Sequence, residues 1–171
     1  ALTTTGMRME EAVAAVVEAV GTMGIDVTPL GGPEEIPARF GALMQELAGR
    51  SPIDLAELPE TGDPAHQQLQ RLLASALPAA AMSESPYYLP LLFAAVRHVL
   101  VHGVTDEASG ILAQLGVFLH MAGMTDAAFA SGAATATVLE RFGRATGGFI
   151  EFNVFVRHWS RPASECLAKL R

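Results

Sequence analysis

Apolar residues recur at helical spacing along most of the chain, and glycines or prolines separate the apolar segments. This pattern predicts helices over residues 7–23, 33–48, 64–76, 85–102, 105–121, 125–142, 147–159 and 161–171. The helix over 85–102 carries two apolar stripes, so we expect other helices to cover it on two sides. The pattern therefore favours an all-α fold of about eight antiparallel helices, stacked as hairpins in a tetratricopeptide-like superhelix or solenoid.

A short motif repeats in the second half of the chain. The segment Gly103-Val-Thr-Asp-Glu-Ala108 recurs 20 residues later as Gly123-Met-Thr-Asp-Ala-Ala128, and Gly143 follows at the same spacing. We expect each glycine to end a helix in a left-handed conformation and each Thr-Asp pair to cap the next helix. Two such helices form a hairpin of about 40 residues, near the length of HEAT-like repeats.

The first half of the chain lacks this regularity. Residues 49–63 are expected to form a long irregular segment. Pro78 is expected to distort its helix or to end it near Ala76. We therefore expect one helical-repeat domain over residues 1–171, with an irregular part over 1–85 and regular hairpins over 86–171. The chain does not begin with Met, which suggests a piece excised from a longer polypeptide.

Composition and charge narrow the choice of partner and compartment. Half of the 171 residues are hydrophobic, enough for a full core, and the formal net charge is −7. Residues 1–86 hold 12 acidic and four basic side chains, and no basic cluster suits a phosphate backbone, so nucleic-acid binding is not expected. There is no apolar run of membrane-spanning length and no signal-peptide pattern, so we expect a cytoplasmic protein without a membrane partner.

Catalytic motifs are absent from the sequence. It contains no phosphate-binding P-loop, no kinase glycine-rich loop or catalytic loop, and no G-x-S-x-G serine. Because Cys166 is the single cysteine, the sequence excludes an internal disulfide and a cysteine-based zinc site. We expect Cys166 to be a small buried apolar residue. These features predict a protein that is not an enzyme and has no cofactor.

Two histidines have the spacing of metal ligands. His98 and His102 are four residues apart on one helical face, and a third ligand would have to come from elsewhere, such as His120 or Asp106. The alternative is that His102 simply sits favourably at the negative end of its helix, beside Gly103. We expect the second arrangement, with no metal.

Two polar–aromatic groups are candidate partner contacts. Arg157, His158 and Trp159 interrupt an otherwise apolar helix, and an Arg beside an aromatic ring can anchor a partner. The alternative, which we favour, is that Trp159 packs inward while Arg157 and His158 are solvated at the turn. In Tyr87-Tyr88, one ring is expected to pack inward and the other to line a groove, with Tyr87 as the candidate contact.

A series of short strings resembles one protein family. The strings are Met23-Gly24-Ile25 with Pro29, Ile53-Asp54-Leu55 with Leu58-Pro59, Thr61-Gly62-Asp63-Pro64, Pro90-Leu91-Leu92, His102-Gly103, Leu139-Glu140-Arg141-Phe142-Gly143 and Arg157-His158-Trp159. In this order they resemble the helical, tetratricopeptide-like segment of very large bacterial signalling proteins. The family more often has Met at the position of Gly62 and Asn at that of Val104.

The resemblance implies a regulatory role. In such proteins a Ser/Thr-kinase-like domain and a predicted AAA/STAND-type ATPase precede the helical segment, and GAF, histidine-kinase or cyclase modules often follow it. It implies a noncatalytic scaffold in signal transduction or transcription regulation that contacts other domains of its polypeptide or a signalling protein. The alternative is a sensor that binds a small-molecule inducer in an apolar pocket between the helices over residues 86–159.

Overall fold

The computed structural model describes residues 2–144, and its regular elements are helical. They are α1 (Leu2–Thr22), the 3-10 turn η1 (Pro33–Glu35), α2 (Ile36–Leu47), α3 (Pro52–Ala56), α4 (Pro64–Met82), α5 (Tyr88–His102), α6 (Ala108–Met121) and α7 (Thr125–Arg141). The prediction of an all-α fold is confirmed for these residues. The helices predicted over 147–159 and 161–171 lie outside them.

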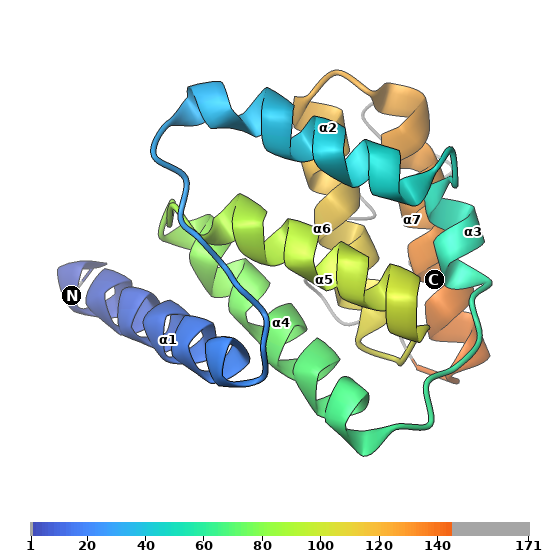
Figure 1. Cartoon of the computed structure of the whole chain (residues 1–171), viewed down its shortest axis with the longest axis horizontal. Coiled ribbons are helices and arrows are strands. Elements are labelled where there is room, and N and C mark those ends of the chain that lie inside the picture. Colours follow the sequence, from blue (N-terminus) through green and yellow to red (C-terminus); the bar gives the residue numbers. More distant parts are fainter. Residues whose placement is uncertain (1, 145–171) are drawn as a thin grey trace.

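Four helices form an array in the spatial order α1, α4, α5, α2 (Figure 1). In this array α4 and α5 are the inner helices. Helix α4 packs against α1, α5 and α6, and α5 packs against α4, α2 and α6. Six consecutive residues of α5, Leu91 to Val96, are buried, which confirms that this helix is covered on more than one side. None of the helices in the described part of the chain is long and apolar enough to cross a lipid bilayer.

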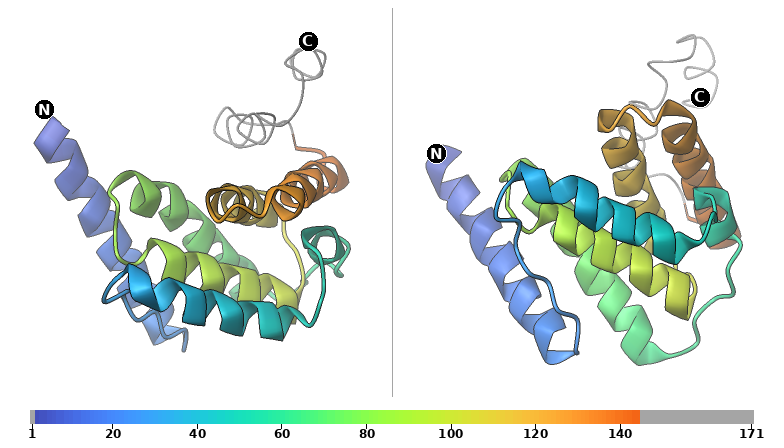
Figure 2. Two further views of the ribbon diagram at one scale, coloured as in Figure 1. Left: turned by 90° about the horizontal axis from the view of Figure 1, so that it is seen from above. Right: turned by 45° about the horizontal axis from the view of Figure 1, so that its top comes forward.

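The last two helices within residues 2–144 form a pair, which packs on α5 and α4 of the array through α6. Helices α6 and α7 pack against each other and run at a steep angle to α5, as the views of Figure 2 show. The short α3 packs on α7, and Arg141 of α7 donates hydrogen bonds to the carbonyl oxygens of Ala56 and Leu58 at 3.4 and 2.7 Å. The array and the pair meet at three rings: Phe40 of α2, Phe93 of α5 and Phe118 of α6, with centroids 5.1 to 6.1 Å apart.

The first half of the chain departs from simple hairpins in three ways. Helix α1 packs on α4, not on its neighbour in sequence, through the buried Val13 and Val20. Helix α3 lies inside the segment predicted to be irregular, and Ser51 and Asp54 form a capping box at its start. Helix α4 continues through Pro78 to Met82, because tertiary packing of the last two turns, including the buried Leu77 and Ala80, outweighs one lost backbone hydrogen bond.

The repeated glycines have positive φ, as expected, but they do not act alike. At Gly123 the backbone closes α6 with hydrogen bonds from Gly123 N to His120 O and from Met124 N to Leu119 O, at 3.0 and 2.9 Å. At Gly103 ψ is −170°, so the chain extends instead, and Val104 forms a parallel bridge with Glu60. Gly143 closes α7 as Gly123 closes α6, with hydrogen bonds from Gly143 N to Glu140 O and from Arg144 N to Leu139 O at 3.1 and 2.9 Å, so the repeat is one of local structure at these two glycines and not at Gly103.

The Thr-Asp pairs also differ from each other. The hydroxyl of Thr105 accepts a hydrogen bond from Glu107 N at 3.2 Å and donates one to Gln70 Oε1 at 2.8 Å. By contrast, α7 begins at Thr125 itself, and the preceding Met124 makes no side-chain cap. The prediction that both pairs cap the following helix is wrong for Thr125, and the Thr105 hydrogen bond falls in the turn before α6, whose N-cap residue Glu107 makes no side-chain cap.

Candidate functional site

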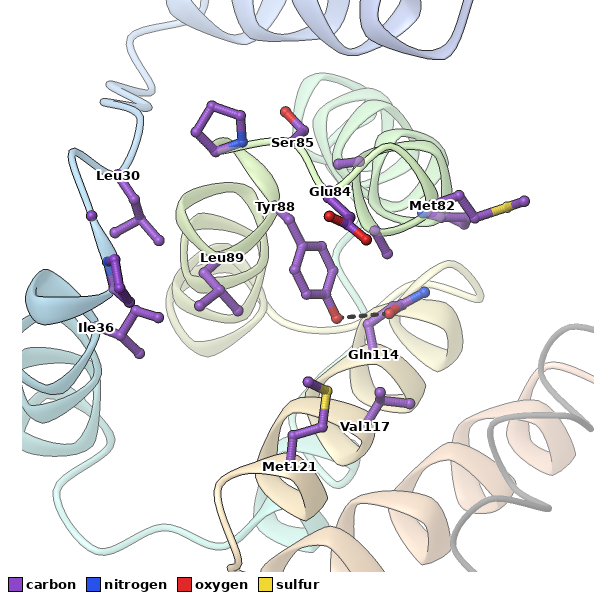
Figure 3. Close-up of a pocket in the computed structure, with 16 residues that line it drawn as sticks. Leu30, Ile36, Met82, Glu84, Ser85, Tyr88, Leu89, Gln114, Val117 and Met121 are labelled. Carbon is purple, nitrogen blue, oxygen red and sulfur yellow. Dashed lines mark hydrogen bonds between the residues drawn. The ribbon is translucent and has the colours of Figure 1, made fainter. Parts of the chain in front are cut away.

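A mostly apolar pocket opens where the connector before α2 meets the ends of three helices (Figure 3). Its volume is about 600 Å³. We call it the Tyr88 pocket. The residues that line it are Leu30, Gly32, Pro33, Ile36, Pro78, Ala80, Ala81, Met82, Glu84, Ser85, Pro86, Tyr88, Leu89, Gln114, Val117 and Met121.

The turn between α4 and α5 places one wall of the Tyr88 pocket. The amide of Ser85 donates to Ala80 O at 2.9 Å, and Glu84 takes a left-handed conformation with φ of 52°. This reversal directs the chain into α5, so Tyr88 lies at the first residue of that helix. The connector is attached to the same turn, because Leu30 N donates to Pro86 O at 3.0 Å.

Tyr88 and Gln114 form the polar part of the pocket. The Tyr88 hydroxyl donates a hydrogen bond to Gln114 Oε1 at 3.0 Å and so joins α5 to α6 (Figure 3). Burial raises the pKa of Tyr88 to about 12, so its phenol keeps its proton at neutral pH. The other amide atom of Gln114, Nε2, is buried without a hydrogen-bond partner. A buried donor of this kind is costly to leave unpaired, and a ligand with an acceptor atom would satisfy it once the amide turned toward the cavity.

Two methionines lie at the outer edge of the pocket. Met82 at the end of α4 is 68% exposed, and Met121 at the end of α6 is 79% exposed. Methionine side chains are flexible and polarisable, so they adapt to apolar partners of different shapes. The pocket therefore combines a fixed inner wall with an adjustable apolar rim.

A group of three histidines lies elsewhere, between α4 and α5. His66 stacks on His102 with ring centroids 3.6 Å apart, and His98 lies 4.5 Å from His102 and 5.2 Å from His66. Burial, followed by the nearby charge of His102, lowers the pKa of His98 to about 4. The third histidine is thus His66, and neither His120 nor Asp106 belongs to the group.

The residues singled out from the sequence fall only partly in these sites. Tyr88 lines the pocket, whereas Tyr87 is half-buried, packs against the core and does not line it. Arg157, His158 and Trp159 lie outside the described residues, so partner contact through them stays a prediction.

Sequence reasoning missed Gln114 and His66. Gln114 is an isolated amide in an otherwise apolar helix, between Ile111 and Phe118, and such a residue signals a buried polar contact. His66 carries no comparable signal, because its proximity to His98 depends on how α4 packs against α5.

Comparison with known proteins finds no match: no protein-family model, no curated protein and no solved structure matches the chain.

Proposed function

We propose that the chain is a noncatalytic binding domain whose Tyr88 pocket takes an apolar small molecule that carries one hydrogen-bond acceptor. The observations that carry this proposal are the mostly apolar lining of the pocket and the presence in its wall of Gln114, whose buried Nε2 has no hydrogen-bond partner and would turn toward the cavity to bind a ligand. Its volume of about 600 Å³ lies within the usual range for small-molecule sites. A carbonyl or ether oxygen of the ligand would accept the hydrogen bond from Gln114.

The ionisable groups of the pocket support binding more than catalysis. Tyr88 has a pKa of about 12 and its hydroxyl is already engaged with Gln114, so it is a poor proton donor or acceptor for a reaction at neutral pH. Glu84 is exposed at the mouth of the pocket. Binding here would connect α4, α5 and α6 and could thus be sensed by other domains of a longer signalling polypeptide.

A second candidate is a scaffold that contacts another protein or domain through the same pocket. The exposed Met82 and Met121 favour it, since apolar side chains from a neighbouring domain could pack between them. This function agrees with the resemblance to the helical segments of bacterial signalling ATPases and kinases, in which the partner would be another domain of the same polypeptide.

Methyl NMR of the full chain with isotope-labelled methionine tests the proposal. We expect benzamide and acetanilide fragments to shift the Met82 and Met121 signals, because both residues lie at the pocket rim, and to leave the Met23 signal in place. A Val117→Trp substitution, which fills the pocket, should abolish the shifts. The matched Val101→Trp substitution should not, because Val101 is 70% exposed and does not line the pocket.

The result also separates the two candidates. Shifts that persist in Val117→Trp, or fragments that move none of the rim signals, would rule out the small-molecule site. If only a neighbouring domain of the parent polypeptide shifts Met82 and Met121, the scaffold is the correct function.

A further inference from the structure

Three imidazoles from two helices converge near the start of α4 and the end of α5. His98 and His102 are one helical turn apart on α5, and His66 faces them from the first turns of α4. One ring nitrogen of each lies within 4.8 Å of those of the other two. Three histidine nitrogens at the corners of a small triangle form a common ligand set for zinc.

The most buried member of this group has a free ligand atom. His98 is 4% exposed, and its Nε2 is buried with no hydrogen-bond partner. The lone pair of an unpartnered, unprotonated imidazole nitrogen is available to a metal ion.

A carboxylate beside the group suits a cation. Asp63, at the N-cap of α4, has a carboxylate oxygen 3.8 Å from Nε2 of His66. A carboxylate next to a ligating histidine orients its ring and offsets part of the charge of the metal.

The rings must turn for all three to reach one ion. Zinc–nitrogen bonds of about 2.0–2.1 Å require the ligand atoms to approach more closely than the 4.8 Å limit. His66 and His102 are half-buried and stack face to face, so they can rotate without disturbing the core, whereas His98 is fixed. Binding would exchange one ring stack for metal–nitrogen bonds.

We propose that His66, His98 and His102 form a three-histidine site for a divalent transition-metal ion of the zinc class. Imidazole nitrogen favours Zn²⁺ and Co²⁺ over Mg²⁺ and Ca²⁺, which prefer oxygen ligands. The ion links the start of α4 to the end of α5. The proposal is independent of the Tyr88 pocket, because the two sites share no residue.

Titration of the chelator-treated full chain with Zn²⁺ and Co²⁺ tests the site. Calorimetry is expected to give one Zn²⁺ per chain, and Co²⁺ to give the visible absorption bands of a nitrogen-ligated ion, with no competition from Mg²⁺ or Ca²⁺. His66→Gln and His102→Gln should each weaken Zn²⁺ binding at least about tenfold. His120→Gln is the matched control, because His120 is not part of the group, and should bind as the unaltered chain does.

Several outcomes would overturn the proposal. They are an absence of Zn²⁺ binding by the unaltered chain, full affinity in both His66→Gln and His102→Gln, and loss of affinity in a control variant. His98→Gln changes a buried side chain and could impair folding, so the two half-buried positions decide the result. Circular dichroism shows that each variant compared is folded.

Discussion

At the scale of the residue, Gly103 and Gly123 occupy matching places in a sequence repeat but meet different surroundings. A Cβ atom at Gly103 would lie 2.1 Å from the carbonyl oxygen of Pro59, whereas one at Gly123 would meet no atom within 4 Å. Both have positive φ, 91° and 76°. Position 123 requires glycine for its backbone conformation alone. Position 103 requires glycine for its backbone conformation and also for the close approach of the backbone at Pro59.

The two glycines should therefore differ in their sensitivity to alanine. Gly123→Ala is expected to lower the free energy of unfolding by about 1–2 kcal/mol, the cost of a left-handed non-glycine residue. Gly103→Ala adds a steric clash with Pro59 and should cost clearly more. Urea denaturation of both variants measures the difference, and equal losses would contradict the close contact described here.

At the scale of the element, one buried side chain attaches α4 to the loop between α5 and α6. Gln70 of α4 is fully buried, and its Nε2 donates to Gly103 O at 2.7 Å. Its Oε1 accepts from the amide and the hydroxyl of Thr105, at 3.2 and 2.8 Å. The amide of Gln70 thus satisfies backbone groups that would otherwise be buried and unpaired.

Replacing Gln70 tests this attachment. Gln70→Met keeps the side-chain length but leaves buried backbone groups of Gly103 and Thr105 unpaired, so it should lower the free energy of unfolding by about 2–4 kcal/mol. Gln68→Met, on the exposed side of the same helix, should change it by less than about 0.5 kcal/mol. A small loss at Gln70 in urea denaturation would show that the loop is held by other contacts.

At the scale of the whole molecule, the periodicity of apolar residues predicts which segments are helical but not which helices are neighbours. The bounds of α5, α6 and α7 agree closely with the apolar pattern, and the central place of α5 follows from its two stripes. The packing of α1 on α4 does not follow, because an amphipathic face fits any apolar partner of suitable shape. Short elements such as α3 are set by local capping and leave little periodic signal.

Both candidate sites depend on this long-range packing. Tyr88 meets Gln114 across 26 positions of sequence, and His66 meets His98 across the interface of α4 and α5. The sequence pointed to Tyr87-Tyr88 and to the pair of His98 and His102, but it could not supply the residue that completes either site. In each case that residue comes from another helix.

The central claim is that Gln114 Nε2 donates a hydrogen bond to an acceptor atom of a ligand that binds in the Tyr88 pocket. Gln114→Glu tests it most directly at a pH high enough to ionise the buried carboxyl, because the carboxylate keeps an acceptor for the Tyr88 hydroxyl and has no donor. The unaltered chain should bind a carbonyl-containing aromatic fragment about tenfold more tightly than a hydrocarbon of equal size, a difference of about 1.4 kcal/mol. In Gln114→Glu this preference should vanish, whereas Gln68→Glu should retain it. An unchanged preference in Gln114→Glu, or no preference in the unaltered chain, would contradict the account.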